Sequence, residues 1–177
     1  MRDLIIKHKP LYLAVFAAFL FLFAKNWEPG IGVSSTTYGV FAKNIAASNN
    51  WFHFSLGPNL FDPFIDHPYL KIWIDAVVFK IFGASAQTIR LTSSILGLAC
   101  IAAMFQIAKN VLDEKVAAWA TFSLFTITIF FNFSASEWLD IPMVTFTMCG
   151  YYLMVCGERS LKNSWWYLFA AGLLFSC

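Results

Sequence analysis

Charge is scarce in this sequence. Only 12% of its 177 residues are charged, 59% are hydrophobic, and the formal net charge is +2 at pH 7. A soluble domain carries about 25% charged residues, so this chain has too few to cover a soluble surface. The small net charge and the lack of a Lys/Arg cluster also argue against nucleic-acid binding. Long uncharged apolar runs predict instead an all-α polytopic membrane protein.

Cysteine patterns typical of metal sites or disulfide frameworks are also missing. The four cysteines, Cys100, Cys149, Cys156 and Cys177, all lie within apolar runs. We expect them to be small buried hydrophobic side chains. The sequence contains no internal repeat and no low-complexity segment, so we treat residues 1–177 as a single membrane domain.

The apolar runs predict four to five transmembrane helices, since a span needs about 20 apolar residues. We place them at residues 11–25, 88–109, 116–135, 141–157 and 164–177. No small-residue cleavage site follows the first run, so we expect an uncleaved helix rather than a signal peptide. The last run is too short to cross, and we expect either a fragment or a shortened protein.

Basic residues predict the orientation of these helices, because loops rich in lysine and arginine stay in the cytoplasm. The N-terminus is basic, and the loops at 110–115 and 158–163 hold Lys115, Arg159 and Lys162. We therefore expect a cytoplasmic N-terminus. The segments 26–86 and 136–140 then share the external side.

Residues 26–86 form a predicted external loop that is too polar to span. We expect two interfacial amphipathic helices in it, at about 37–48 and 68–83. In the first, serines and threonines at 34–37 offer N-cap oxygens, and the spacing of Tyr38, Phe41, Ala42 and Ile45 predicts one apolar face. In the second, Lys71 and Asp75 are four residues apart and can pair along one face, and Gly83 is the expected C-cap.

Ionisable side chains gather between these two helices, in DPFIDHPYLKIW at 62–73. Such groups are costly near a bilayer, so this cluster indicates a functional site. Asp66 and Asp140 are the candidate catalytic residues, because group transfer to a hydroxyl or amine needs a carboxylate base. Asp66 is also the candidate ligand of a divalent metal ion, the one cofactor we consider. The external candidates for substrate binding are His67, Lys71, Arg90 and Glu137.

Structural roles compete with these assignments. Asp62 before Pro63 is typical of a turn, and Glu137 suits a solvated loop. Asp140 directly precedes Ile141-Pro142, which suits an N-cap. Arg90, at a helix start, could snorkel or pair with a loop acid.

Short motifs follow one another in a fixed order. They are Y-x-x-x-A-x-N at 38–44, [DEH]-x-P-x-L-x-x-W at 66–73, F-x-x-F-G at 79–83, R-L-x-S at 90–93 and D-x-P at 140–142. In this order the chain resembles the GT-C polytopic glycosyltransferases related to protein O-mannosyltransferases and the lipid A aminoarabinose transferase. The resemblance makes Tyr38, which begins the first motif, a further substrate-binding candidate.

The resemblance implies an enzyme of the bacterial inner (plasma) membrane. It would transfer a hexosyl, pentosyl or mannosyl group from a polyprenyl-phosphate donor to a lipid, glycan or protein acceptor on the external face. Two departures stand against this. The family's acidic pair before the tyrosine is replaced here by Ser34 and Ser35, and the chain is much shorter than family members.

Two other functions stay open at this stage. A non-catalytic membrane protein could keep carrier-lipid or partner binding without chemistry, which the missing acidic pair would explain. A transporter fragment is disfavoured, because the ionisable groups lie in external loops or at the ends of the predicted spans, and no charge for a coupling ion lies inside a span.

Overall fold

The computed structural model describes residues 33–57, 69–136, 138–159 and 164–175. All regular elements in these ranges are helices, which confirms the all-α class. They are α3 (Val33–Ser48), α4 (Leu70–Phe82), α5 (Ala86–Val111), α6 (Glu114–Thr126), α7 (Thr128–Ser134), α8 (Asp140–Arg159) and α9 (Ser164–Phe175). The first expected span, 11–25, lies outside the described residues.

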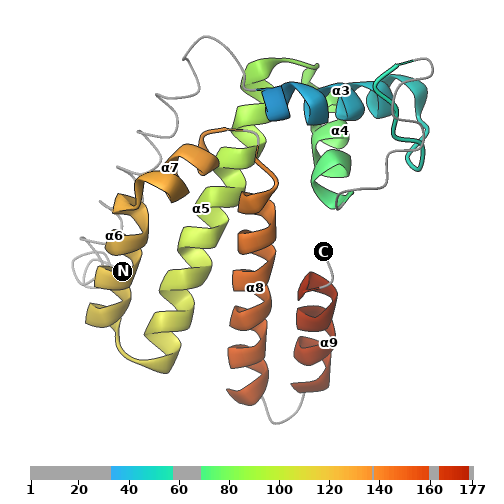
Figure 1. Ribbon diagram of the computed structural model, residues 1–177. Coiled ribbons are helices and arrows are strands. Elements are labelled where there is room, and N and C mark those ends of the chain that lie inside the picture. Colours follow the sequence, from blue (N-terminus) through green and yellow to red (C-terminus); the bar gives the residue numbers. More distant parts are fainter. Residues whose placement is uncertain (1–32, 58–68, 137, 160–163, 176–177) are drawn as a thin grey trace.

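The helices form a bundle with a small layer across one end (Figure 1). In the bundle α5 lies beside α8, α9 packs on the other side of α8, and α6 and α7 cover α5. The layer consists of α3 and α4, which pack on each other and on the start of α5. At the opposite end, the Arg159 guanidinium donates a hydrogen bond to the Asn110 side chain at 3.0 Å. The two basic loops expected to share a side therefore do lie at the same end.

The central helix is α5, for which the sequence predicted a span at 88–109. Ser85 caps it, accepting a hydrogen bond from the Thr88 backbone N–H, and the helix runs for 26 residues. At about 1.5 Å per residue this length exceeds a hydrocarbon core of about 30 Å. Among the described residues, α5 alone is long and apolar enough to cross a membrane as one helix.

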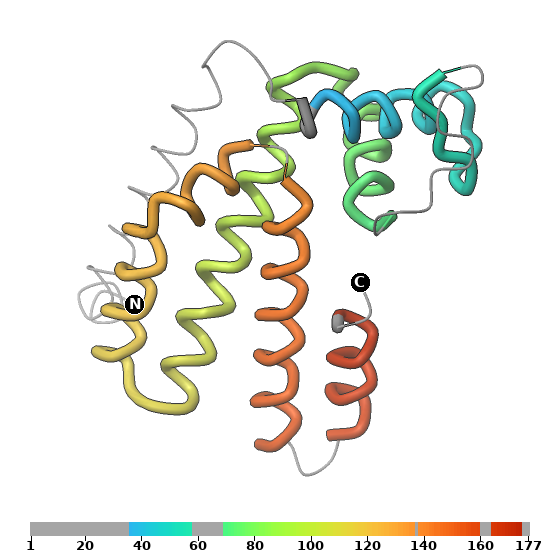
Figure 2. The backbone as a smooth tube through the Cα atoms, in the orientation of Figure 1, coloured from blue at the N-terminus to red at the C-terminus, as the bar shows by residue number. Residues whose placement is uncertain are grey.

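The stretch expected as one span at 116–135 forms two helices, α6 and α7, bent by 73° (Figure 2). The break falls at Ile127, whose backbone is extended. Thr126-Ile127-Thr128 is a run of β-branched residues, which favour helix less than straight-chain residues do. The Thr126 hydroxyl also donates to the Ser123 carbonyl, and the bend lets Phe130 and Phe131 become buried.

Small and hydroxyl-bearing residues let α5 approach its neighbours closely. A Cβ added to Gly97 would lie 2.6 Å from Ser134 Oγ and 2.7 Å from its Cβ, so glycine is needed there. Ser94 donates to the Ser134 carbonyl at 3.3 Å, and Thr145 of α8 donates to the Leu96 carbonyl at 3.0 Å. Close packing of small residues with interhelical hydrogen bonds is how membrane helices associate.

The end layer has its own apolar core. Phe41, Ala42 and Ile45, predicted to share one face of α3, are all buried there against α4. Helix α3 already includes Val33, so the serines and threonines at 34–37 lie within the helix rather than before it. Helix α4 ends at Gly83 with φ 83°, which confirms the expected glycine C-cap. An interfacial position for either helix stays a prediction.

We predict that Gly97→Ala destabilises the fold, by about 1–3 kcal/mol, because the new Cβ has no room beside Ser134. Gly172→Ala is the matched control, since a Cβ at that glycine of α9 meets nothing within 4 Å. That change should be neutral or stabilising, because alanine favours helix over glycine by up to about 1 kcal/mol. Thermal unfolding in detergent, followed by circular dichroism, measures both. Equal effects would contradict the close packing of α5 and α7.

Candidate functional site

The end layer brings together side chains that are far apart in the sequence. Tyr38 lies on α3, and Asp140 is the first residue of α8. Burial raises the pKa of the Tyr38 hydroxyl above its ordinary value of 10.0, and the negative charge of Asp140 raises it further. The two groups are therefore close enough to interact, as expected for two segments on one side of the membrane. Tyr38 stays protonated near neutral pH and can donate a hydrogen bond.

Asp140 begins its helix rather than capping it from outside. The helix includes Asp140, and the Leu139 carbonyl accepts from the Met143 N–H at 3.3 Å. A carboxylate in the first turn still favours the helix through the macrodipole. Asp140 is exposed, whereas Ile141 and Pro142 behind it are buried. Its carboxylate is thus held at the end of the bundle and remains accessible.

Arg90 lies in the second turn of α5 and is only 8% exposed. Its guanidinium therefore does not reach out into solvent, which removes the snorkelling alternative considered from the sequence. A buried guanidinium is stable only when it is paired or hydrogen-bonded. Arg90 therefore places a fixed positive charge beneath the layer that carries Tyr38.

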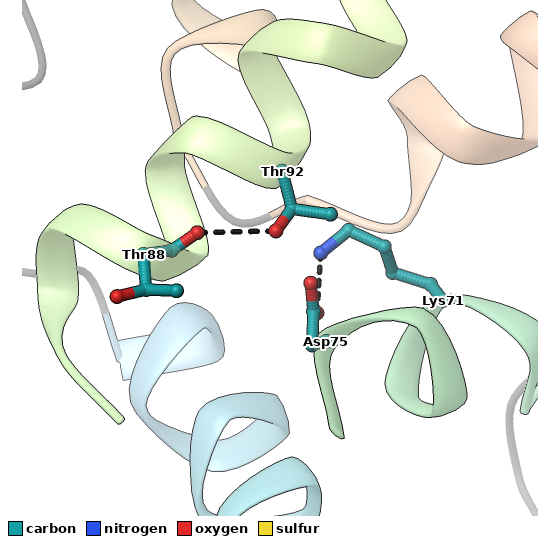
Figure 3. A network of polar contacts seen from close by, with 4 residues as sticks. All are labelled: Lys71, Asp75, Thr88 and Thr92. Atoms are coloured by element: carbon teal, nitrogen blue, oxygen red, sulfur yellow. Dashed lines mark hydrogen bonds and ion pairs between the residues drawn. The ribbon is translucent and has the colours of Figure 1, made fainter. Parts of the chain in front are cut away.

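Lys71 and Asp75 form a buried ion pair on α4, with exposed fractions of 2% and 0%. This confirms the predicted pairing four residues apart. Figure 3 shows both side chains directed toward α5, where the Thr92 hydroxyl donates to the Thr88 carbonyl at 3.1 Å. Within the described part of the chain, the second carboxylate oxygen of Asp75 has no hydrogen-bond partner. A phosphate could contact the Lys71 ammonium only by competing with Asp75.

A set of aromatic contacts, which the sequence reading missed, holds the loop after α3 onto α4. Phe54 stacks on Tyr69 with ring centroids 4.2 Å apart, and the Trp73 indole N–H donates to the Trp51 carbonyl at 2.7 Å. Asn44 of α3 also donates to the Ser55 carbonyl at 2.8 Å. The feature of the sequence that could have predicted these contacts is the concentration of aromatic residues at 51–54 and 69–73. These contacts fix the start of α4, which lies within the motif that begins at Asp66.

Three of the predicted site residues, Asp66, His67 and Glu137, lie outside the described residues, so their roles stay predictions. Where the chain is described, no three His, Cys, Asp or Glu side chains come together to hold a metal ion. Of the candidates that are described, the structure brings Tyr38 and Asp140 together. It pairs Lys71 with the buried carboxylate of Asp75.

We predict that Asp140→Asn lowers the pKa of Tyr38 but leaves it above 10.0, because burial is the larger of its two causes. Titration of ¹³C-labelled tyrosine by NMR in detergent measures this, with Tyr38→Phe used to assign the signal. Asp113→Asn, at the opposite end of the bundle, is the control and should leave the pKa unchanged. No shift in Asp140→Asn would show that the two groups do not interact.

We predict that Asp75→Asn destabilises the fold, by up to about 3–5 kcal/mol, because it removes the negative charge that pairs with the buried Lys71 ammonium. Replacing both residues, as Lys71→Met with Asp75→Leu, should restore most of that loss. The control breaks the partly exposed ion pair of Lys109 and Glu114, in which Lys109 Nζ and Glu114 Oε2 are 3.6 Å apart. Glu114→Gln should cost less than about 1 kcal/mol. Thermal unfolding in detergent compares the stability of the single, double and control variants. Equal losses of stability in Asp75→Asn and Glu114→Gln would contradict the buried ion pair.

Comparisons with known proteins extend this description. The family model described as dolichyl-phosphate-mannose-protein mannosyltransferase matches residues 66–177. Among solved structures, the chain is similar to ArnT from Cupriavidus metallidurans in the apo state, with a TM-score of 0.77 and 18% identity. No curated protein matches the sequence.

The likeness to ArnT covers 93% of this chain and 30% of that chain, so this chain spans less than a third of the similar protein. At such low identity, the likeness shows that the two share a fold. The family match covers Asp140, Arg90 and the motif that begins at Asp66. It confirms the resemblance read from the order of the motifs and makes this an integral membrane protein. The chain belongs to the dolichyl-phosphate-mannose-protein mannosyltransferase family, among the GT-C membrane glycosyltransferases.

Proposed function

We propose that this chain is part of a glycosyltransferase that takes a sugar from a polyprenyl-phosphate donor. The acceptor would be a lipid, glycan or protein on the external face of a bacterial inner membrane, with the N-terminus in the cytoplasm. The observation that carries this proposal is the accessible carboxylate of Asp140 at one end of the bundle, whose charge acts on Tyr38 of α3, inside a chain of this family. Both residues belong to motifs on which the family resemblance rests.

The proposed reaction is a displacement at the anomeric carbon of the sugar. A carboxylate accepts a proton from the acceptor hydroxyl or amine, whose oxygen or nitrogen then bonds to that carbon. The bond from the carbon to the phosphate oxygen breaks, and polyprenyl phosphate leaves with the electron pair. General base catalysis of this kind contributes about 10²–10⁴-fold.

The chain offers two carboxylates for the base, Asp66 and Asp140. Asp140 is accessible at the start of α8, and its negative charge raises the pKa of Tyr38. A protonated Tyr38 would donate a hydrogen bond to the sugar or to a phosphate oxygen. His67, Lys71, Arg90 and Glu137 are the remaining residues that we propose contact the substrate, and positive charge there would stabilise the leaving phosphate.

A divalent metal ion held by Asp66 is a further element of the proposal. It would stabilise negative charge on the phosphate as it leaves. Removal of divalent ions with EDTA should then abolish transfer, and added Mg²⁺ or Mn²⁺ should restore it. Full activity in EDTA would remove the metal from the proposal and leave the carboxylate base unaffected.

We predict that Asp66→Asn and Asp140→Asn lower turnover unequally. Substitution of the residue that acts as the base should lower turnover about 10²–10⁴-fold, and substitution of the supporting residue should lower it less. The measurement is transfer of a radiolabelled sugar from a polyprenyl-phosphate donor, in membranes that contain the protein at its full natural length. Glu158→Gln is the control, because Glu158 is exposed at the opposite end of the bundle. Unchanged turnover in both aspartate variants would exclude these residues as the base.

A second candidate function is favoured by Ser34 and Ser35, which stand where family members carry an acidic pair. A serine near neutral pH is not a base without an activating partner. The chain would then bind a carrier lipid or a partner without chemistry. Purified protein that binds polyprenyl phosphate but transfers no sugar from any donor would support this function over the first.

A further inference from the structure

Helix α3 has a second face that the proposed site does not use. Thr36, Gly39, Val40 and Lys43 recur at helical spacing and line a cavity of about 160 Å³ between α3 and the start of α5. We call this cavity the α3–α5 pocket; Phe79, Ala86 and Ile89 line it from the other helices. Tyr38 instead packs with the opposite, buried face of α3. The pocket is therefore separate from the pair formed by Tyr38 and Asp140.

The walls of the pocket are held rigidly. Gly39 lets α3 cross close to α5, because a Cβ there would lie 2.6 Å from the Ile89 side chain. The turn between α4 and α5 is fixed by Thr88, whose hydroxyl donates to the Gly83 carbonyl at 3.1 Å. Its backbone N–H also donates to Ser85 Oγ at 3.1 Å. The hollow thus follows from the fixed packing of three helices.

The lining is apolar with one positive charge at its edge. Val40, Phe79 and Ile89 form an apolar surface. Among the described residues that line the pocket, Lys43 is the one charged residue, and none is a carboxylate. Lys43 is itself exposed, so its ammonium is accessible to a ligand. A cavity of about 150 Å³ holds a group the size of benzene. This combination fits an amphiphile that has an anionic group next to a short apolar segment.

The position of the pocket indicates the source of such a molecule. It lies where α5 begins, and the length and apolar composition of α5 predict that this end of the helix stands at the level of the lipid headgroups. Beside it, Phe82 follows Phe79 by one turn of α4 and is 71% exposed. An exposed aromatic residue and a lysine at this level are typical of a surface that contacts lipid.

We propose that the α3–α5 pocket binds an anionic phospholipid of the surrounding bilayer. Its phosphate or headgroup lies at Lys43, and the glycerol and first acyl carbons lie against Val40, Phe79 and Ile89. The bound lipid fixes the end layer, which carries Tyr38, to the membrane surface. This inference depends on the pocket alone, so it holds whether or not the chain catalyses sugar transfer.

The test is native mass spectrometry of the detergent-purified protein titrated with phosphatidylglycerol or with phosphatidylcholine. The unmodified protein should bind phosphatidylglycerol more tightly. Lys43→Gln should weaken that binding about fivefold, the effect of one lysine near an anionic surface, and leave phosphatidylcholine binding unchanged. Lys43→Arg should keep the preference. Ala86→Phe, which fills the pocket, should weaken the binding of both lipids.

The matched control is Lys80→Gln, which removes a lysine of the same layer that lies outside the pocket and hydrogen-bonds Asn49. This variant should bind phosphatidylglycerol as the unmodified protein does. If it weakens that binding as much as Lys43→Gln does, the preference comes from general surface charge and not from the pocket. Unchanged binding in Ala86→Phe would overturn the pocket as the site. Displacement of the lipid by millimolar inorganic phosphate would show a site for free anions instead. Lys43 is exposed, so its variants should fold, and size-exclusion chromatography checks this.

Discussion

The close approach of other helices to α5 is the constraint on which the whole structure depends. Between apolar helices in lipid there is no hydrophobic driving force, so association depends on packing and on hydrogen bonds between helices. Gly97 gives α5 room for Ser134, and Ser94 and Thr145 add hydrogen bonds to carbonyls of neighbouring helices. Because α5 also forms part of the base of the end layer, its packing sets where Tyr38 of α3 and Asp140 of α8 lie relative to each other.

The relative position of Tyr38 and Asp140 has an electrostatic consequence. Tyr38 and Asp140 come from helices about 100 residues apart, yet the carboxylate raises the pKa of the phenol. Burial, the larger cause, acts in the same direction because it disfavours the charged tyrosinate. The result is a hydrogen-bond donor held beside an accessible carboxylate. The opposite face of the same helix carries Lys43 and the apolar pocket, so one short helix can serve two different ligands.

Much of this could be predicted from the sequence, because the signals are local. Scarce charge and long apolar runs predicted the helical membrane class, and the spacing of Phe41, Ala42 and Ile45 predicted the buried face of α3. The ion pair of Lys71 with Asp75 follows from their separation of four residues in a helix. The bend at Ile127 was missed, because a β-branched run is a weak signal that gains effect only when the bent helix buries Phe130 and Phe131.

The sequence alone thus determined the class, the helical faces, the glycine cap at Gly83 and the family, since each depends on neighbouring residues or on motif order. Tertiary structure decided which candidate residues meet. Burial of Lys71 against Asp75 and of Arg90 in α5 depends on how α4 and α5 pack. The interaction of Tyr38 with Asp140 and the pocket at Lys43 depend on how α3, α5 and α8 are placed in space. Such contacts join distant segments, and no local pattern of residues specifies them.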